Sequence, residues 1–157
     1  MEADFSISSL DSSVAKNWLD ATYLGGALHV FLDPGSIPVS YVNAAWAASQ
    51  GLIFNRLETP KRIRYPTGEI VYSFAFVEVS ILIKKKIDNK TFNTPNLKLF
   101  CLDDLTPHII LGSRHLYELD LYAELPKLEL LRQQQCDENP EAFDVEIPSM
   151  ASMDQSK

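Results

Sequence analysis

An apolar run that ends on one acidic residue most constrains what this chain can fold into. Residues 28–32 read Leu-His-Val-Phe-Leu and lead directly into Asp33, Pro34, Gly35 and Ser36. Burial opposes the ionisation of a carboxylate unless hydrogen bonds or a second charged group compensate. The run therefore predicts a buried strand whose terminal acid either takes part in chemistry or caps a turn. The turn alternative is open, because Pro and Gly stand where a type I or type II turn favours them.

Strand patterns also dominate the rest of the chain. Residues 62–65 and 70–74 are strand-like, and they are joined by four residues that include turn formers, which predicts a β-hairpin. Residues 76–83 alternate between apolar and other side chains, as one continuous half-buried strand would. The remaining short apolar segments that predict strands are residues 27–32, 97–102 and 108–111.

Two helices are expected among these strands. Ser40 can cap a helix that runs through Ser49, and Gly51 is suited to end it. A shorter helix is expected after Gly112. Many short strands with one clear helix indicate a mainly β domain that is closed or sandwich-like.

Composition divides the chain into three parts. Residues 1–16 are rich in Ser and Asp without periodicity, which predicts a flexible leader. Residues 17–125 carry the strand patterns and are expected to form one folded domain. Residues 126–157 become polar and are expected to be a mostly disordered tail.

Charge and cysteine content argue against several classes of function. The formal net charge is −7, whereas proteins that bind nucleic acids or acidic membranes carry a basic face. No apolar run approaches the roughly 20 residues of a membrane span, and the first residues are acidic, unlike a signal peptide. The two cysteines form no disulfide framework and no zinc-site spacing. We therefore expect an intracellular protein without metal or cofactor.

Three features in order resemble a known family. The apolar strand ending in Asp33 comes first, the hairpin follows it, and an apolar strand closed by glycine comes last. That last motif consists of Ile109, Ile110, Leu111 and Gly112. Over residues 20–120 the chain resembles the retropepsin-like aspartic proteases, especially those of gypsy-type LTR retrotransposons and their domesticated relatives.

The resemblance implies a fold and an assembly. It implies a retropepsin-like acid protease fold, a closed β-barrel-like half with one short helix, which pairs with a second copy about a two-fold axis. The resemblance places Asp33 of each copy at that axis, where two neighbouring carboxylates cannot both ionise and so share a proton. The loop of Pro34, Gly35 and Ser36 would surround the acids, and Gly35 would allow close approach of the backbone.

The resemblance also assigns roles to the other two motifs. The hairpin would be a flap that closes over bound substrate, formed by Tyr65, Pro66, Thr67, Gly68 and Glu69. The last motif, residues 109–112, would pack beneath the active-site loop as core. The implied activity is an aspartic endopeptidase that acts on an extended peptide or polyprotein, in the cytoplasm or in a virus-like particle.

One residue departs from the family pattern. Pro34 stands where the family has Ser or Thr, whose hydroxyl ties the two active-site loops together across the dimer. Proline supplies neither a hydroxyl nor a backbone N–H, although Ser36 offers a hydroxyl nearby. A lost buried hydrogen bond typically costs about 1 kcal/mol. An inactive protease-derived module for peptide binding or dimerisation is therefore the alternative, and an unrelated small β-barrel binding protein is a third.

Other chemically interesting residues have simpler interpretations. His29 and His115 lack a nucleophile at a recognisable spacing, and His29 is expected to be a partly exposed or hydrogen-bonded strand residue. Trp46 lies among alanines and is expected to pack a helix. Asp103 and Asp104 precede a Leu-Thr-Pro segment and are expected in a loop.

Overall fold

The computed structural model describes residues 3–8 and 17–125. By its internal contacts the chain divides into two units, Met1–Glu124 and Leu125–Lys157, and the account below concerns the first. Residues 9–16 of the expected leader and the expected tail, 126–157, lie outside the described residues.

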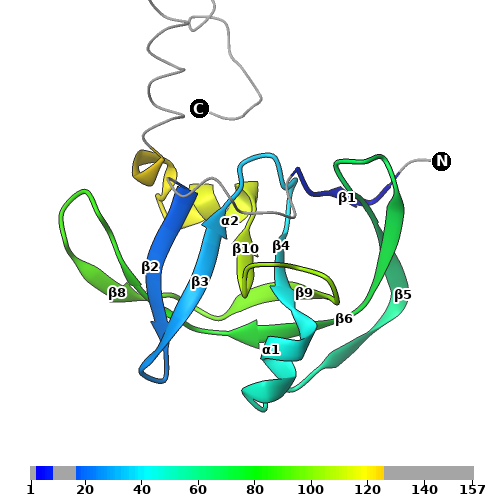
Figure 1. The fold of residues 1–157 in the computed structure, drawn as a ribbon, viewed down its shortest axis with the longest axis horizontal. Helices are drawn as coiled ribbons and strands as arrows, with labels where there is room; N and C mark the ends of the chain where they lie inside the picture. Colours follow the sequence, from blue (N-terminus) through cyan, green and yellow to red (C-terminus); the bar gives the residue numbers. More distant parts are fainter. Residues whose placement is uncertain (1–2, 9–16, 126–157) are drawn as a thin grey trace, which may run out of the picture. The chain divides into compact units, whose positions relative to one another are not determined.

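The described residues form a mainly β structure, as the sequence predicts (Figure 1). The strands are β1 (Phe5–Ser6), β2 (Trp18–Tyr23), β3 (Gly26–Leu32), β4 (Ser40–Asn43), β5 (Asn55–Arg64), β6 (Ile70–Val79), β7 (Leu82–Lys84), β8 (Thr91–Asn93), β9 (Leu97–Leu102) and β10 (Ile109–Leu111). The helices are α1 (Ala44–Ser49), α2 (Ser113–Glu118) and the 3-10 turn η2 (Tyr122–Glu124).

All of these strands belong to one sheet, in the order β1-β5-β6-β9-β4-β10-β3-β2-β7-β8. The expectation of a closed barrel is not met, because the sheet is open. The two end strands, β1 and β8, each pair with one neighbouring strand only, and they do not pair with each other.

The centre of the sheet places the last apolar motif beside the strand that ends in Asp33. Strand β10 runs parallel to β3, with Ile109 opposite Val30 and Leu111 opposite Leu32. It also runs antiparallel to β4, which follows the Asp33 loop in the chain. The chain therefore leaves β3, passes through the loop and returns as β4 on the other side of β10, so that β10 closes the gap beneath the loop.

The predicted hairpin is present, but the long alternating strand is not continuous. Strands β5 and β6 are antiparallel, and Arg64 lies opposite Ile70 at their hairpin end. Strand β6 stops at Val79, and β7 begins at Leu82. The break occurs because the chain changes partners: the backbone of Ile81 donates to Thr94 Oγ1 at 3.0 Å and accepts from the Thr94 N–H at 2.8 Å.

The first helix begins later than its capping signal predicts. Ser40 starts strand β4, which pairs with β9, and α1 begins only at Ala44. Asn43 is the N-cap, and its side-chain oxygen accepts from Trp46 N at 3.0 Å. Gly51 ends the helix with a φ of 73°, as expected of a glycine in that position. Sheet pairing has thus overruled the local capping preference of Ser40.

Part of the expected leader is an ordered strand. Strand β1 pairs in parallel with β5, with Phe5 opposite Ile63 (Figure 1). Ile7 is buried, with 2% of its surface exposed. The expectation of a flexible leader is therefore wrong for residues 3–8, because backbone pairing and an apolar anchor fix them.

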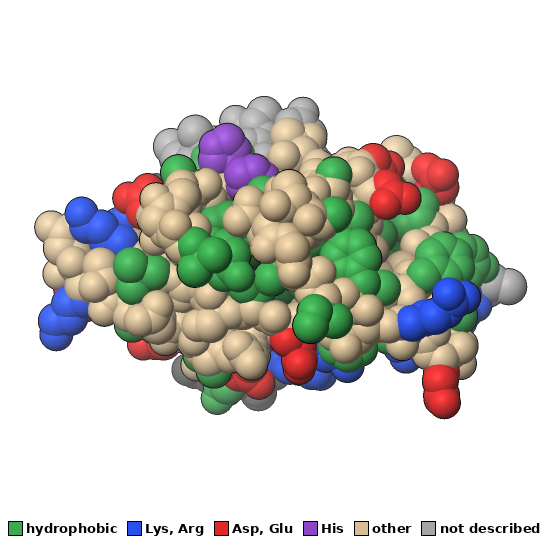
Figure 2. All heavy atoms as spheres, turned by 90° about the horizontal axis from the view of Figure 1, so that it is seen from below, with side chains coloured by type: hydrophobic (Ala, Val, Ile, Leu, Met, Phe, Trp, Pro, Cys, Tyr) green, Lys and Arg blue, Asp and Glu red, His purple; other side chains and the backbone are tan. Residues whose placement is uncertain are grey.

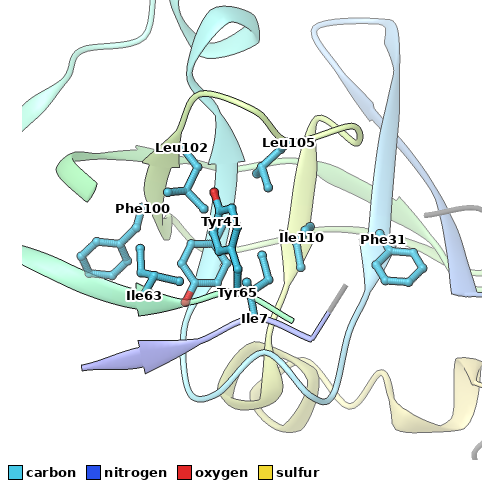
Figure 3. Packing of buried hydrophobic residues seen from close by; sticks show 9 residues of the cluster. All are labelled: Ile7, Phe31, Tyr41, Ile63, Tyr65, Phe100, Leu102, Leu105 and Ile110. Atoms are coloured by element: carbon cyan, nitrogen blue, oxygen red, sulfur yellow. The ribbon is translucent and has the colours of Figure 1, made fainter. Parts of the chain in front are cut away.

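One core cluster includes Ile7 of this N-terminal segment (Figure 3). Its buried members come from five strands and the segments beside strands: Ile7, Phe31, Tyr41, Ile63, Tyr65, Phe100, Leu102, Leu105 and Ile110. On the face in Figure 2, hydrophobic side chains form separate groups, with acidic and basic side chains dispersed among them. Among the described residues no helix is long and apolar enough to cross a membrane.

Candidate functional site

Asp33 lies directly after β3, at the point where the strand ends and the loop begins. Its backbone N–H donates to Leu111 O at 3.0 Å, which continues the pairing of β3 with β10 by one residue. The side chain is buried, with 4% of its surface exposed. The acid thus keeps a fixed position at the end of two paired strands.

Four hydrogen bonds surround the Asp33 carboxylate, two on each oxygen. Gly35 N donates to Oδ1 at 3.0 Å, and Ser36 Oγ donates to Oδ2 at 2.8 Å. Ser8 supplies the other two, through its hydroxyl to Oδ1 and its backbone N–H to Oδ2 at 3.3 Å. These donors replace the water that the carboxylate loses on burial.

The Asp33–Ser36 tetrapeptide is a turn as well as an acid-bearing loop. Ser36 N donates to Asp33 O at 3.0 Å, which is the hydrogen bond of a β-turn. Ser36 is fully buried, and its hydroxyl serves the acid of its own chain. Pro34 occupies the second position of the turn, where its missing N–H leaves no donor unpaired. The two interpretations of the motif are therefore compatible.

Two glycines allow the close contacts around this loop. A Cβ at Gly35 would lie 2.5 Å from Ser8 Oγ and 3.4 Å from Asp33 Oδ1. A Cβ at Gly112 would lie 2.1 Å from Val39 O and 2.7 Å from Ser36 O, both of which are backbone atoms. Gly112 is therefore packed directly against the loop. Ile109, Ile110 and Leu111 before it are fully buried.

The Ser40 hydroxyl connects Gly112 to His115, for which the sequence alone indicates no partner. Gly112 N donates to Ser40 Oγ at 2.8 Å, and Ser40 Oγ lies 2.6 Å from His115 Nδ1. With one hydroxyl hydrogen available, Ser40 donates to Nδ1 of a neutral imidazole. Burial lowers the pKa of His115, which favours that neutral form. Ser40 and His115 are 75 residues apart, so no local signal connects them.

The hairpin residues fall into two groups. Pro66, Thr67, Gly68 and Glu69 are exposed, and the turn is closed by Gly68 N donating to Tyr65 O at 2.9 Å. Tyr65 itself lies in the core cluster, where its hydroxyl donates to Asp104 Oδ1 at 2.8 Å (Figure 3). Burial, and then that hydrogen bond, raises the pKa of Tyr65 above its usual value. The exposed tip is therefore joined to the core at a buried tyrosine.

His29 and Trp46 belong to an aromatic stack away from Asp33. His108 is the shared member, with ring centroids 5.0 Å from His29 and 5.4 Å from Trp46. The His29 N–H donates to His108 Nδ1 at 3.1 Å, and burial lowers the pKa of His108. The stack joins α1 to the sheet and offers no nucleophile.

Sequence reasoning missed two residues at the site, Ser8 and Tyr41. Ser8 lies in a stretch without periodicity, 25 residues before the acid that it contacts. Tyr41 donates to Ser6 O at 3.2 Å, and its pKa is raised by burial and then by the charge of Asp33. Only the alternation around Tyr41 could have placed it, and that segment was expected to be helical.

The candidate site consists of one acid and a hydroxyl-bearing turn, packed against Gly112. Among residues 3–8 and 17–125, no group of three or more His, Cys, Asp or Glu side chains is placed to hold a metal ion. Neither the family models nor the sequences of curated proteins match this chain.

Proposed function

We propose that the chain is an aspartic endopeptidase with a retropepsin-like fold, active as a homodimer in which Asp33 of each copy forms a carboxylate pair. Its substrate is an extended peptide segment, such as a polyprotein linker. The order of the three motifs supports the proposal, as does their arrangement around β10.

The observation that carries the proposal is the construction around Asp33. The acid is buried at the end of β3, and β10 is inserted between β3 and β4 with Gly112 against the loop. The hydrogen bond from Gly35 N to Asp33 Oδ1 is that of an Asx turn, but such a turn does not require a strand and Gly112 to pack beneath it. Side chains of this kind, held rigidly by packed strands, are typical of catalytic groups.

Peptide hydrolysis by such a pair needs no metal and no covalent intermediate. One Asp33 carboxylate takes a proton from a water molecule, whose oxygen attacks the peptide carbonyl carbon. The protonated Asp33 of the second copy donates its proton to the carbonyl oxygen, giving a tetrahedral diol. The C–N bond then breaks as the first Asp33 gives its proton to the leaving nitrogen and a diol hydroxyl returns a proton to the second Asp33, and the carboxyl and amine products depart.

A second function, peptide binding without turnover, is favoured by two observations. Pro34 has no hydroxyl to join the two loops across a dimer. Ser8, Gly35 and Ser36 already supply four hydrogen bonds to the Asp33 carboxylate. A carboxylate satisfied in this way is inert until one of its donors leaves.

A cleavage assay separates the two functions. The intact chain is incubated with a polyprotein-like peptide at mildly acidic pH, beside Asp33→Ala, Pro34→Thr and, as a matched acid-to-alanine control, exposed Asp20→Ala. We expect pepstatin-sensitive cleavage that Asp33→Ala abolishes and Asp20→Ala retains. Cleavage that appears only in Pro34→Thr would instead assign the natural chain to the binding function. Cleavage that survives Asp33→Ala would refute the endopeptidase.

A further inference from the structure

Residues 4–8, here called the N-terminal strap, lie against the hairpin strand β5 along one edge. Asp4 N donates to Arg62 O at 2.9 Å, and Ile7 N donates to Arg64 O at 3.0 Å. The Arg62 N–H in turn donates to Asp4 Oδ2 at 3.1 Å. The strap is therefore paired, residue by residue, with the strand that leads to the hairpin tip.

The other edge of the strap faces the loop that follows Asp33. Ser6 and Ile37 exchange two backbone hydrogen bonds, at 2.8 and 3.0 Å, as in an antiparallel pair. Two residues further on, Ser8 reaches the Asp33 carboxylate with both its hydroxyl and its backbone N–H. The strap thus lies between the hairpin and the acid, with hydrogen bonds on both of its edges.

The side chains of the strap contact different parts of the structure. The ring of Phe5 lies 5.1 Å from the ring of Phe100, and Lys61 Nζ lies 5.7 Å from the Phe5 centroid. Ile7 is buried in the core cluster beside Tyr65 (Figure 3). Asp4 lies at the far end, 3.6 Å from the Arg62 guanidinium.

Backbone pairing on both edges, with separate sites for alternate side chains, is how proteins bind extended peptides by strand addition. The strap has the length and the contacts of a bound peptide, although it belongs to the same chain. It is also a strand of only two residues at one end of the sheet order, and a segment this short can open locally while the rest of the sheet stays folded.

We propose that the space between β5 and the loop after Asp33 is a peptide-binding groove, that it selects segments of the pattern acidic–aromatic–any–aliphatic–serine, and that the strap is its resident occupant. While it is seated, the strap covers Asp33 and excludes other peptides. The statement that the covered acid is catalytic rests on the proposed function, whereas the groove and its selectivity do not.

Displacing the strap within the full chain tests the proposal. The probe is a fluorescent peptide, Ala-Asp-Phe-Ser-Ile-Ser, titrated into the intact chain, into Ile7→Asp, and into Ile87→Asp as a control at an isoleucine that is 66% exposed. We expect Ile7→Asp to bind the probe at least about tenfold more tightly than the other two, because its groove is vacated. A probe of scrambled sequence should bind Ile7→Asp no more tightly than it binds the intact chain.

A second variant guards against misfolding of Ile7→Asp. Ser6→Pro removes the N–H that Ile37 O accepts without placing a charge in the core. Hydrogen exchange then follows the Ile37 amide, which should be protected in the intact chain, exposed in Ser6→Pro and protected again when the probe is added. Unchanged exchange and unchanged affinity in Ser6→Pro would overturn the groove.

Mass spectrometry of the same samples keeps the two proposals separate. A probe that binds Ser6→Pro but is never cleaved supports the groove, and the peptidase is then judged by the polyprotein-like peptide alone. Cleavage that depends on Asp33 but proceeds equally fast in the intact chain and in both strap variants refutes the strap as a cover and leaves the peptidase standing.

Discussion

Two buried carboxylates, Asp33 and Glu124, have nearly equal exposure, 4% and 3%, but very different partners. Glu124 accepts the backbone N–H groups of Lys86 and Ile87, at 2.6 and 3.3 Å, in the turn between β7 and β8. Asp33 accepts two of its four hydrogen bonds from Ser8 of the N-terminal strap. Burial therefore does not distinguish a structural acid from a reactive one. The distinction lies in whether the donors can leave and be replaced.

The largest difference between the two acids is expected in turnover. Asp33→Asn should lower the cleavage rate by about a thousandfold, because it removes the general base and acid together. Glu124→Gln should leave the rate per folded molecule unchanged. Initial rates on one peptide, normalised to the folded fraction by circular dichroism, compare the two. An equal loss of cleavage rate in both variants would show that Asp33 and Glu124 do not differ in their role in turnover.

The next effect concerns the packing of Gly112 against the loop that follows Asp33. Gly112→Ala should destabilise the fold by more than about 3 kcal/mol, because the new Cβ would lie against backbone oxygens that cannot move independently. Gly26→Ala is the matched control, since its Cβ would meet Tyr23 O at an ordinary 3.5 Å. Urea unfolding of both variants measures the difference. A stable Gly112→Ala would show that the loop is loosely supported.

Removal of the structural acid should be costly to stability alone. Glu124→Ala removes the charged acceptor of two part-buried backbone N–H groups, at about 1.5–3 kcal/mol. The measurement is the free energy of unfolding in urea. If the variant is as stable as the intact chain, the Lys86–Ile87 turn finds other acceptors and Glu124 is not structural.

Ser8→Ala should have a smaller effect on stability and the opposite effect on activity. Asp33 keeps Gly35 and Ser36 as donors, so the loss should be about 0.5–1.5 kcal/mol. Cleavage should become faster, since the strap is held less firmly. A parallel Ser49→Ala change, at an exposed helix end, controls for the substitution itself. Slower cleavage by Ser8→Ala would mean that Ser8 assists Asp33.

The smallest effect is a pH dependence from His115. Burial holds its pKa in the folded chain below the unfolded value of 6.5, so the unfolded state binds the proton first as the pH falls. The stability contribution is complete above pH 6.5 and is lost as the pH falls below it. His108 acts in the same direction. His115→Gln should flatten the decline in unfolding free energy between pH 7.5 and 5.5. An unchanged decline would show that His115 is not the source of the pH dependence.

Local patterns predicted the parts of the fold that depend on local sequence. The hairpin, β9 and β10 lie where apolar segments and turn residues indicated them, because short apolar runs between turns form strands. Ser40 suggested a helix start, but its capping preference is weaker than the pairing of β4 with β9 and β10. The strap was missed because two strand residues carry no periodicity, and its contacts are made 25 or more residues away.

The candidate site was predictable to the same extent. Asp33, Gly35 and Ser36 are neighbours in the chain, so their proximity needed no knowledge of the fold. Gly112 was placed beneath the loop by resemblance and by the order of the motifs. Ser8 could not be found, since its role depends on where the strap crosses the sheet.

Mixing intact and Asp33→Asn chains tests the central proposal, paired Asp33 residues, most directly. The two chains are unfolded together in urea in equal amounts, refolded, and assayed at a fixed total concentration. If each site needs Asp33 from both copies, activity should fall to about one quarter of that of the intact chain, because only one pairing in four is complete. An activity of about one half would contradict the account, since each copy would then act alone.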